Sequence, residues 1–461
     1  MKLLTSVIPA LAFVLIAPFS FATDLVQAWQ AAQLHDPEFA AAQASYEATM
    51  THRDQSRGMW LPTVKLTAGV GVQDSATKTS GAQFSAPGFT QTNGVAFDTS
   101  INNGKAEQYA LVARQPVLNR ALLSQTRQLD LSADMAEIAW KEAKQQLALR
   151  VAERYFDLTI ANETLRLLKQ QQVAVELAFN QTKDSFKLGS IPVTDTFEAQ
   201  ARVETIKAQI MAAEMDVQIK QSTFADLTGI SSQDLALIVL PNNTNSIALP
   251  SIEKSLDETT QNNPALLIQE TKLSSAKEEA EKHRLYATPT IDVVAQTGYD
   301  KVHGNGDFGP AENSANNRMI GIQLTIPLFT GGIRSSKYTE SVHLIDKAKS
   351  EGELLRQQLL LQTRAAWLGI TVGESRVAAL IQAYKASMAR LDATRLGHSE
   401  GDRTTLELLN AENDATSSEL AVVQAQIAVA MNRLKLAQLN GSLDDSTLQV
   451  MNRVLTQQVT K

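Results

Sequence analysis

The sequence predicts an α+β protein that is built from a tandem repeat and is complete only when several copies assemble. Three observations support this fold class. Equivalent motifs recur in both halves of the chain, each half has short segments that alternate apolar and polar residues, and each half has very long segments with helical spacing. Alternation with period two is typical of strands, and apolar residues every three or four positions are typical of helices.

The N-terminus has the pattern of a secretory signal. Lys2 precedes an apolar run over 7–16, and Ser20 and Ala22 are the small residues of a cleavage site. The apolar run is too short to span a bilayer, as is usual for a signal peptide. We therefore expect residues 1–22 to be removed and the mature chain to begin at Thr23.

Composition excludes several classes of protein. The chain has 461 residues, a formal net charge of −7 and no cysteine. A disulfide framework, a thiolate metal site and a lipid-modified cysteine are therefore impossible. The negative charge argues against a nucleic-acid partner. An exported chain without cysteine suits a bacterial envelope, and no run of about 18 apolar residues after the signal could form a transmembrane helix.

Catalytic and metal-binding motifs are missing from the sequence. There is no HExxH, no GxSxG and no phosphate-binding loop, and the six histidines are scattered along the chain. These motifs carry the common zinc, serine-nucleophile and nucleotide chemistries. We expect a protein that is not an enzyme and that holds no metal or cofactor.

The tandem repeat is visible in motif pairs that follow the same order. "HDPEFAAAQASYEA" matches "NNPALLIQETKLSSA", and "WLPTVKLTAGVGV" matches "ATPTIDVVAQTGY" at the same offset. "LVARQPVLNRA" matches "IQLTIPLFTGG" at a smaller offset, so the first half has extra residues near 75–106. That segment is rich in Gly, Ser, Thr and Asn, so we expect an exposed, flexible loop there. Another exposed loop is expected around 300–318.

The repeats set the expected domain boundaries. The first repeat covers 23–228 and the second covers 257–439, with a linker segment over 229–256 and a C-terminal segment over 440–461. Strands are expected at about 62–75, 107–116, 289–300 and 318–327. Long helices are expected at about 119–187, 193–228, 333–398 and 403–439.

The strand patterns leave two interpretations open. Val64, Leu66 and Val70 lie on one face of the first strand, and Lys65 and Thr67 lie on the other. In a soluble sandwich the apolar face would meet another sheet, whereas in an outer-membrane barrel it would meet lipid. Each predicted strand has roughly the 9–11 residues that a tilted membrane strand needs.

The element lengths require an oligomer. The segment 119–187 contains no proline or glycine. As one helix it would reach about 100 Å, far more than a compact domain of this size. Four strands are also too few to close a barrel, since natural barrels begin at about eight. If several copies assembled around one axis, their strands together could close a barrel and their long helices could pack against one another.

The ordered motifs resemble the TolC family of outer-membrane channel-tunnels. The resemblance rests on "TDLVQAWQAAQLHDPE", "WLPTVKLTAGVGV", "LTIPLFTGG" and "LAQLNGSLDD", together with two glycine turns, and it covers about residues 23–455. It implies an α+β membrane protein: a homotrimer whose 12-stranded β-barrel, four strands per chain, continues into a long periplasmic α-helical barrel. The segments 229–256 and 440–455 would form an equatorial girdle.

The same resemblance implies a passive export channel in the bacterial outer membrane that extends into the periplasm. The partners would be outer-membrane lipid, a periplasmic adaptor protein and an inner-membrane transporter of RND, ABC or MFS type. The channel would serve multidrug efflux, type I protein secretion or both. The alternatives are an exported helical scaffold or adhesin, and a dedicated metal- or drug-efflux outlet.

Two short turns lie between the long helices, and they are the candidate functional site. "GSIPVTDTFEA" begins at Gly189 and "GDRTTLELLNA" begins at Gly401, and Asp195 and Glu407 follow at the same spacing. Each glycine is expected to end a helix in a left-handed cap. The resemblance implies that both turns lie at the periplasmic tip of the channel.

Gate and selectivity residues are carried over by position. The resemblance implies that Asp195 pairs with Arg403 and that Thr194 faces His398, which would hold the tip closed. Glu407 and Asn410 match two ring positions, where carboxylates in a narrow pore would favour cations. The alternative for both acidic residues is an ordinary helix-start carboxylate, since acids stabilise helix N-termini.

Two positions depart from the family pattern. The family has a tyrosine where this chain has His398, and an aspartate where it has Asn410. The histidine could still donate a hydrogen bond and could gain charge near pH 6. The asparagine leaves one acidic ring instead of two, so we expect weaker block by multivalent cations.

Overall fold

The computed structural model describes residues 24–231, 248–284 and 288–456. The predicted signal, 1–22, and residues 232–247 of the predicted linker lie outside these ranges. The chain divides into two compact units. The helical unit comprises Met1–Ser45, Ile138–Leu267 and Glu353–Lys461, and the strand unit comprises Tyr46–Glu137 and Ile268–Gly352. Each unit takes equivalent segments from both repeats, so the repeats interleave rather than fold separately.

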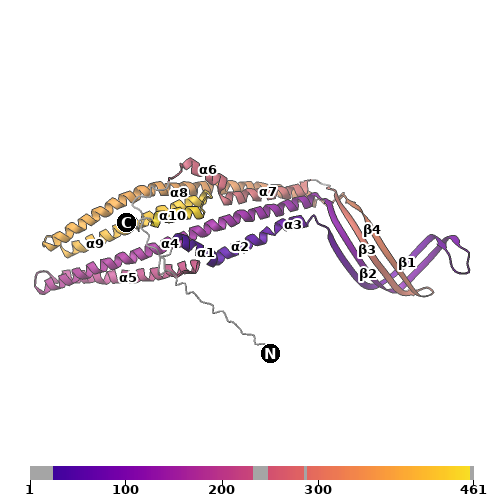
Figure 1. Cartoon of the computed structure of the whole chain (residues 1–461), viewed down its shortest axis with the longest axis horizontal. Helices are drawn as coiled ribbons and strands as arrows, with labels where there is room; N and C mark the ends of the chain where they lie inside the picture. Colours follow the sequence, from indigo (N-terminus) through magenta and orange to yellow (C-terminus); the bar gives the residue numbers. More distant parts are fainter. Residues whose placement is uncertain (1–23, 232–247, 285–287, 457–461) are drawn as a thin grey trace, which may run out of the picture. The chain divides into compact units, whose positions relative to one another are not determined.

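The strand unit contains one antiparallel sheet with the order β1-β2-β3-β4 (Figure 1). The strands are β1 (Thr63–Phe84), β2 (Thr92–Leu118), β3 (Thr290–Gly306) and β4 (Gly309–Thr325). The pairing of β2 with β3 joins the two repeats, with Tyr109 opposite Tyr299. Among the described strands, β1 and β4 pair on one side only. An unpaired edge leaves backbone donors and acceptors free to pair with another chain.

Both predicted loops, at 75–106 and 300–318, are largely exposed as expected, but they form strands instead of loops. β1 continues to Phe84 and β2 begins at Thr92, and the register runs from Ser75 opposite Ile101 to Phe84 opposite Thr92. In the second repeat, β3 and β4 leave only Asp307 and Phe308 between them. Glycine, serine and asparagine suggested loops, but backbone pairing satisfies the ladder regardless of these side chains, and threonine favours strands.

The two faces of the sheet differ in chemistry. Cross-strand partners share a face, and the apolar face carries Leu66, Leu111, Ala295 and Ile320 among its residues. Several of these side chains are strongly exposed in the single chain: Val64 63%, Leu66 73%, Val70 84%, Ile320 80%, Ile322 76%. The opposite, polar face carries Lys65, Thr67, Gln296 and the Arg114–Asp292 ion pair at 2.5 Å.

Four long helices dominate the rest of the chain, and their bounds nearly coincide with the ranges expected from the sequence. They are α4 (Arg120–Lys187), α5 (Val193–Thr228), α8 (Ile333–Ser399) and α9 (Thr405–Leu439). The shorter helices are α1 (Leu25–His35), α2 (Pro37–Met50), α3 (His52–Gly58), α6 (Ile252–Asn262), α7 (Pro264–Arg284) and α10 (Asp445–Thr456). Proline begins both α2 and α7, where its missing N–H costs nothing. No helix in the described ranges is both long and apolar enough to cross a membrane.

The core of the helical unit is apolar and fully buried at its centre. Leu25, Leu147, Val151, Leu434 and Leu448 form part of one cluster, each with 1% or less of its surface exposed. A second cluster joins α8 and α9 through residues such as Ile370 and Val429. Many helical faces lie outside these clusters, so the long helices keep apolar residues at their surface.

Candidate functional site

The turns between α4 and α5 and between α8 and α9 are built in the same way. Gly189 has φ +75° and Gly401 has φ +84°. The amide of Ser190 donates to the carbonyl of Ser185 at 3.0 Å, and the amide of Asp402 donates to Gly397 at 2.8 Å. This is the Schellman pattern, in which a left-handed residue lets the chain satisfy the last helical carbonyls. Both glycines therefore end their helices as the sequence predicts.

The second turn leads into α9 through a complete capping box. The Thr404 hydroxyl accepts from the amide of Glu407 at 3.2 Å, and a Glu407 carboxylate oxygen accepts from the amide of Thr404 at 2.8 Å. Arg403 donates to the other Glu407 oxygen at 2.7 Å. The amide of Thr404, and then Arg403, hold the pKa of Glu407 below its ordinary value of 4.5.

The first turn leads into α5 with weaker side-chain support. Pro192 occupies the cap position in an extended conformation, without a side-chain hydrogen bond. Asp195 lies in the first turn of the helix, where its charge complements the helix dipole. The hydroxyl of Thr194 donates to Asp195 at 3.3 Å. The equivalent acidic positions of the two repeats thus have different local partners.

The structure does not bring the predicted gate pairs together within one chain. In the described ranges Arg403 forms its ion pair with Glu407, not with Asp195. His398 lies 3.2 Å from the Thr405 hydroxyl, not opposite Thr194. Both contacts lie within the second turn itself. Asn410 is exposed on α9.

The two helix pairs nevertheless meet just beyond the turns. Leu409 of α9 packs in a buried cluster with Val175 of α4 and Val203 and Ile206 of α5. Further along, Arg166 of α4 donates to Glu419 of α9 at 2.8 Å. The side chains of Glu163 and Glu419 hold the pKa of Arg166 above its ordinary value, so this link stays charged.

Tyr384 adds a third helix to that link. Its hydroxyl, on α8, donates to Glu419 at 3.2 Å. Burial, and then the nearby Glu419 carboxylate, raise the pKa of Tyr384. A neutral phenol therefore donates to the carboxylate at any physiological pH.

Exposed apolar side chains at both turns were missed by the sequence argument. Leu188 is 82% exposed and Phe197 is 63% exposed at the first turn, and Leu396 is 64% exposed and Leu406 49% at the second. At the first turn, the position of Leu188 directly before Gly189 could have indicated an exposed apolar side chain, because the end of a helix offers few neighbours to cover it. These side chains do not occupy equivalent positions of the two repeats, but exposed apolar groups near both turns indicate a contact surface.

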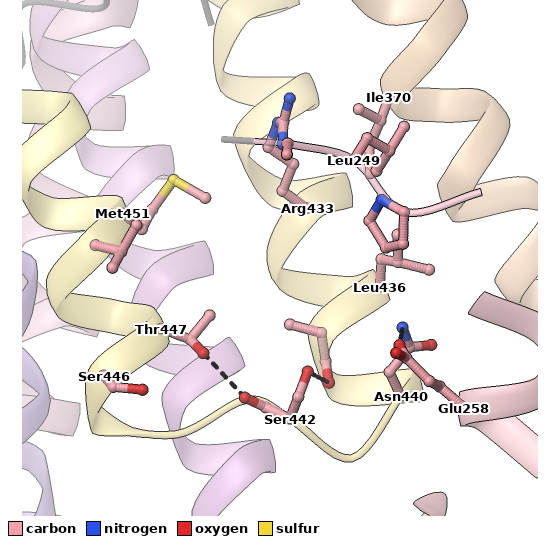
Figure 2. A pocket seen from close by; sticks show the side chains of 14 residues that line it. Leu249, Glu258, Ile370, Arg433, Leu436, Asn440, Ser442, Ser446, Thr447 and Met451 are labelled. Carbon is pink, nitrogen blue, oxygen red and sulfur yellow. Dashed lines mark hydrogen bonds between the residues drawn. The ribbon is translucent and has the colours of Figure 1, made fainter. Parts of the chain in front are cut away.

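A pocket of about 300 Å³ lies between α6, α8, α9, α10 and the irregular segment 248–250 before α6 (Figure 2). Leu249, Ile370, Leu436 and Met451 give it an apolar lining. Two pairs of its polar groups are hydrogen-bonded: Asn440 donates to Glu258 at 2.9 Å, and Thr447 donates to the Ser442 carbonyl at 2.9 Å.

Another buried contact runs beside this pocket and ties the helices together. The Thr259 hydroxyl donates to Asn440 at 3.0 Å and lies 2.9 Å from the Thr363 hydroxyl, so α6, α8 and α9 share one polar junction. Across the described residues, no group of three His, Asp or Glu side chains is arranged to hold a metal ion.

We predict that the start of α9 loosens at low pH. A lowered folded-state pKa means that the Glu407 contacts stabilise the turn above pH 4.5 and that this stabilisation disappears as pH falls through the folded-state pKa. Glu407→Ala, which removes the side-chain acceptor, should lose amide protection over 405–408 already at neutral pH, measured by hydrogen exchange. Glu400→Ala, an exposed change in the same turn, is the control. Equal protection in both variants would contradict the capping role.

Comparison with protein families gives one extensive match. The model described as outer membrane efflux protein matches residues 28–230 and 255–442. The chain is similar to the outer membrane protein TolC of Escherichia coli K12, with 23% identity covering 100% of this chain and 90% of that protein. It is also similar to the alkaline protease secretion protein AprF of Pseudomonas aeruginosa, with 24% identity covering 94% and 87%.

Solved structures share the fold. The open state of the MtrE outer membrane channel of Neisseria gonorrhoeae has a TM-score of 0.70 and 19% identity, and the match covers 92% of this chain and 90% of that one. At this identity the likeness speaks for the fold alone. It extends over both the helical unit and the strand unit.

Proposed function

This chain belongs to the outer membrane efflux protein family, whose members are channels rather than enzymes, and from that premise we infer how it works as an export duct. It is an outer-membrane channel for efflux and type I secretion that extends into the periplasm. We propose that it acts as a homotrimer, with cargo passing through a shared barrel and a shared helical tunnel.

The sheet edges carry this proposal. β1 and β4 are the outer strands of a four-stranded sheet, and both present an unpaired edge among the described residues. Pairing β4 of one copy with β1 of the next would close a ring, and three copies would pool twelve strands. Closure removes every edge, which a lipid environment requires because it offers no water to the free backbone groups.

The surface of the helical unit supports the same assembly. Met211, Met215 and Ile219 form an exposed apolar stripe on α5, and Leu361, Leu368 and Val372 form one on α8. Spacings of four and seven residues place each set on one helix face. In the trimer these stripes would pack between neighbouring copies and enclose the tunnel.

The two turns would form the periplasmic tip of the trimer. Leu188, Phe197, Leu396 and Leu406 would contact the periplasmic adaptor, and the inner-membrane transporter, of RND, ABC or MFS type, would supply the energy. Thr194, Asp195, His398 and Arg403 remain the proposed gate.

Planar-bilayer recording tests the function. Purified protein should form discrete channels, and its removal from the native cell should block export. If the folded protein is inserted into the bilayer and gives no conductance, the alternative of a helical scaffold is favoured.

The proposed selectivity ring has its own test. Glu407→Gln removes the charge but keeps a side-chain oxygen that can accept in the capping box, whereas Thr404→Ala weakens the cap but keeps the charge. We expect Glu407→Gln to reduce cation selectivity in planar bilayers and Thr404→Ala to preserve it, because a charge ring selects through its field. If both variants keep the wild-type reversal potential, Glu407 caps the helix and does not line the pore.

A further inference from the structure

The ends of β1 and β2 extend well beyond the sheet. Residues 75–101, which we call the arm, pair only between β1 and β2 among the described strands. The β2–β3 register ends at Asn102 opposite Asn305, close to the end of β3 at Gly306. At about 3.3 Å per residue the arm adds some 40 Å of hairpin. This added length exceeds what a membrane-spanning strand needs.

The arm begins at a sharp elbow. The register shifts between Gln73 opposite Gly104 and Ser75 opposite Ile101, so β2 carries a bulge at Asn102 and Asn103. Asn103 has φ +53°, and its amide donates to the Asp74 carboxylate at 2.6 Å. A bulge bends a strand and increases its twist. Figure 1 shows the hairpin of β1 and β2 turning sharply beyond the ends of β3 and β4.

The elbow bends toward the polar face. Gly104 and Gly304 lie on that face, and Ile101, only 1% exposed, packs on them. A Cβ on Gly104 would lie 2.9 Å from the Ile101 side chain, and a Cβ on Gly304 would lie 2.8 Å from it. A Cβ on Gly306 would lie 2.9 Å from the Ser100 carbonyl oxygen. The three glycines therefore make room for the arm to cross the polar face.

The far end of the arm is also ordered. The rings of Phe84 and Phe97 lie 5.9 Å apart, and those of Phe84 and Phe89 lie 6.5 Å apart. Lys78 and Asp98 form an ion pair at 3.5 Å across the two strands. Aromatic contacts of this kind stabilise a hairpin end. The arm is therefore a regular β-hairpin and not an irregular loop.

We propose that the arm narrows the outward mouth of the channel and limits the size of what passes through it. The proposal rests on the proposed function, because only in a barrel whose polar face lines the lumen do arms bent toward that face project over the opening. Each copy then contributes one arm, and the residues that set its angle are Ile101, Gly104 and Gly304.

Removing the arm tests the size limit. Replacing residues 76–100 with Asn-Gly, which favours a tight two-residue turn, should raise single-channel conductance and admit larger polyethylene glycols from the outward side. Phe308→Ser, on the fully exposed turn of the other hairpin, should leave both unchanged. Unchanged conductance in an arm-less trimer would overturn the inference and leave the function standing. Full-length trimers that conduct nothing would overturn the function itself.

A second measurement covers the case in which the arm-less variant does not assemble. The chain has no cysteine, so spin labels can be placed at Thr79→Cys on the arm and Ala315→Cys on the polar face of β4. Labelled chains diluted with unlabelled ones should give one narrow distance. Gly304→Val should shift or broaden it. A broad distribution in the wild-type background would contradict a rigid arm.

Discussion

Ile322→Arg should abolish outer-membrane assembly, whereas Gln323→Arg should be tolerated. Ile322 is 76% exposed on the apolar face of β4, and Gln323 follows it on the polar face. An arginine facing lipid costs up to about 2–4 kcal/mol, depending on its depth in the bilayer, and a symmetric trimer incurs that cost in every copy. An arginine facing a water-filled lumen remains hydrated.

The readout is the amount of heat-modifiable oligomer in the outer-membrane fraction of cells that express each variant. The two variants differ by one position and carry the same charge, so expression and export are matched. If both assemble equally well, the apolar face does not contact lipid. If only Gln323→Arg fails, the two faces have been assigned the wrong way round.

Three glycine substitutions should destabilise the helical unit in a fixed order. Gly401, Gly229 and Gly441 all have positive φ, so alanine at any of them costs about 1–2 kcal/mol in backbone strain. At Gly401 a Cβ meets open space, at Gly229 it lies 2.9 Å from the His35 ring, and at Gly441 it lies 2.4 Å from the Asn262 carbonyl oxygen. A side chain can move aside, but a helix-terminal backbone cannot.

We therefore expect Gly401→Ala to be mildest, Gly229→Ala intermediate and Gly441→Ala most severe. Thermal unfolding of each purified variant gives the order, and hydrogen exchange at the end of α9 locates the damage. Gly229 and Gly441 follow the ends of α5 and α9, at equivalent places in the two repeats. A Gly441→Ala variant as stable as Gly401→Ala would contradict the close approach of α6 to this turn.

The long helices could be predicted from the sequence because no proline interrupts them, although α8 contains Gly352, Gly369, Gly373 and Gly397. The absence of glycine and proline across Arg120–Lys187 leaves no reason for a break, and Gly189 and Gly401 mark the ends by their spacing. The arm could not be predicted, because its composition is that of a loop. Only the pairing of distant residues shows it to be a hairpin.

The site was predictable in its backbone and not in its contacts. Equivalent acids six positions after each glycine indicated two helix starts, and the capping box at Thr404 and Glu407 follows from that spacing. The resemblance assigned Asp195 of the other turn as the partner of Arg403, whereas the structure pairs Arg403 with Glu407, four positions further along the chain. Positions carried over from a family do not fix which carboxylate an arginine selects.

Threefold closure is tested most directly by the mass of the detergent-solubilised native particle, measured by native mass spectrometry. The account predicts a single species with three times the mass of the mature chain, reduced to one chain by heating in denaturing detergent. A folded particle that has the mass of one chain and stays dispersed without detergent would contradict it, because its sheet edges and apolar face would then need no partner.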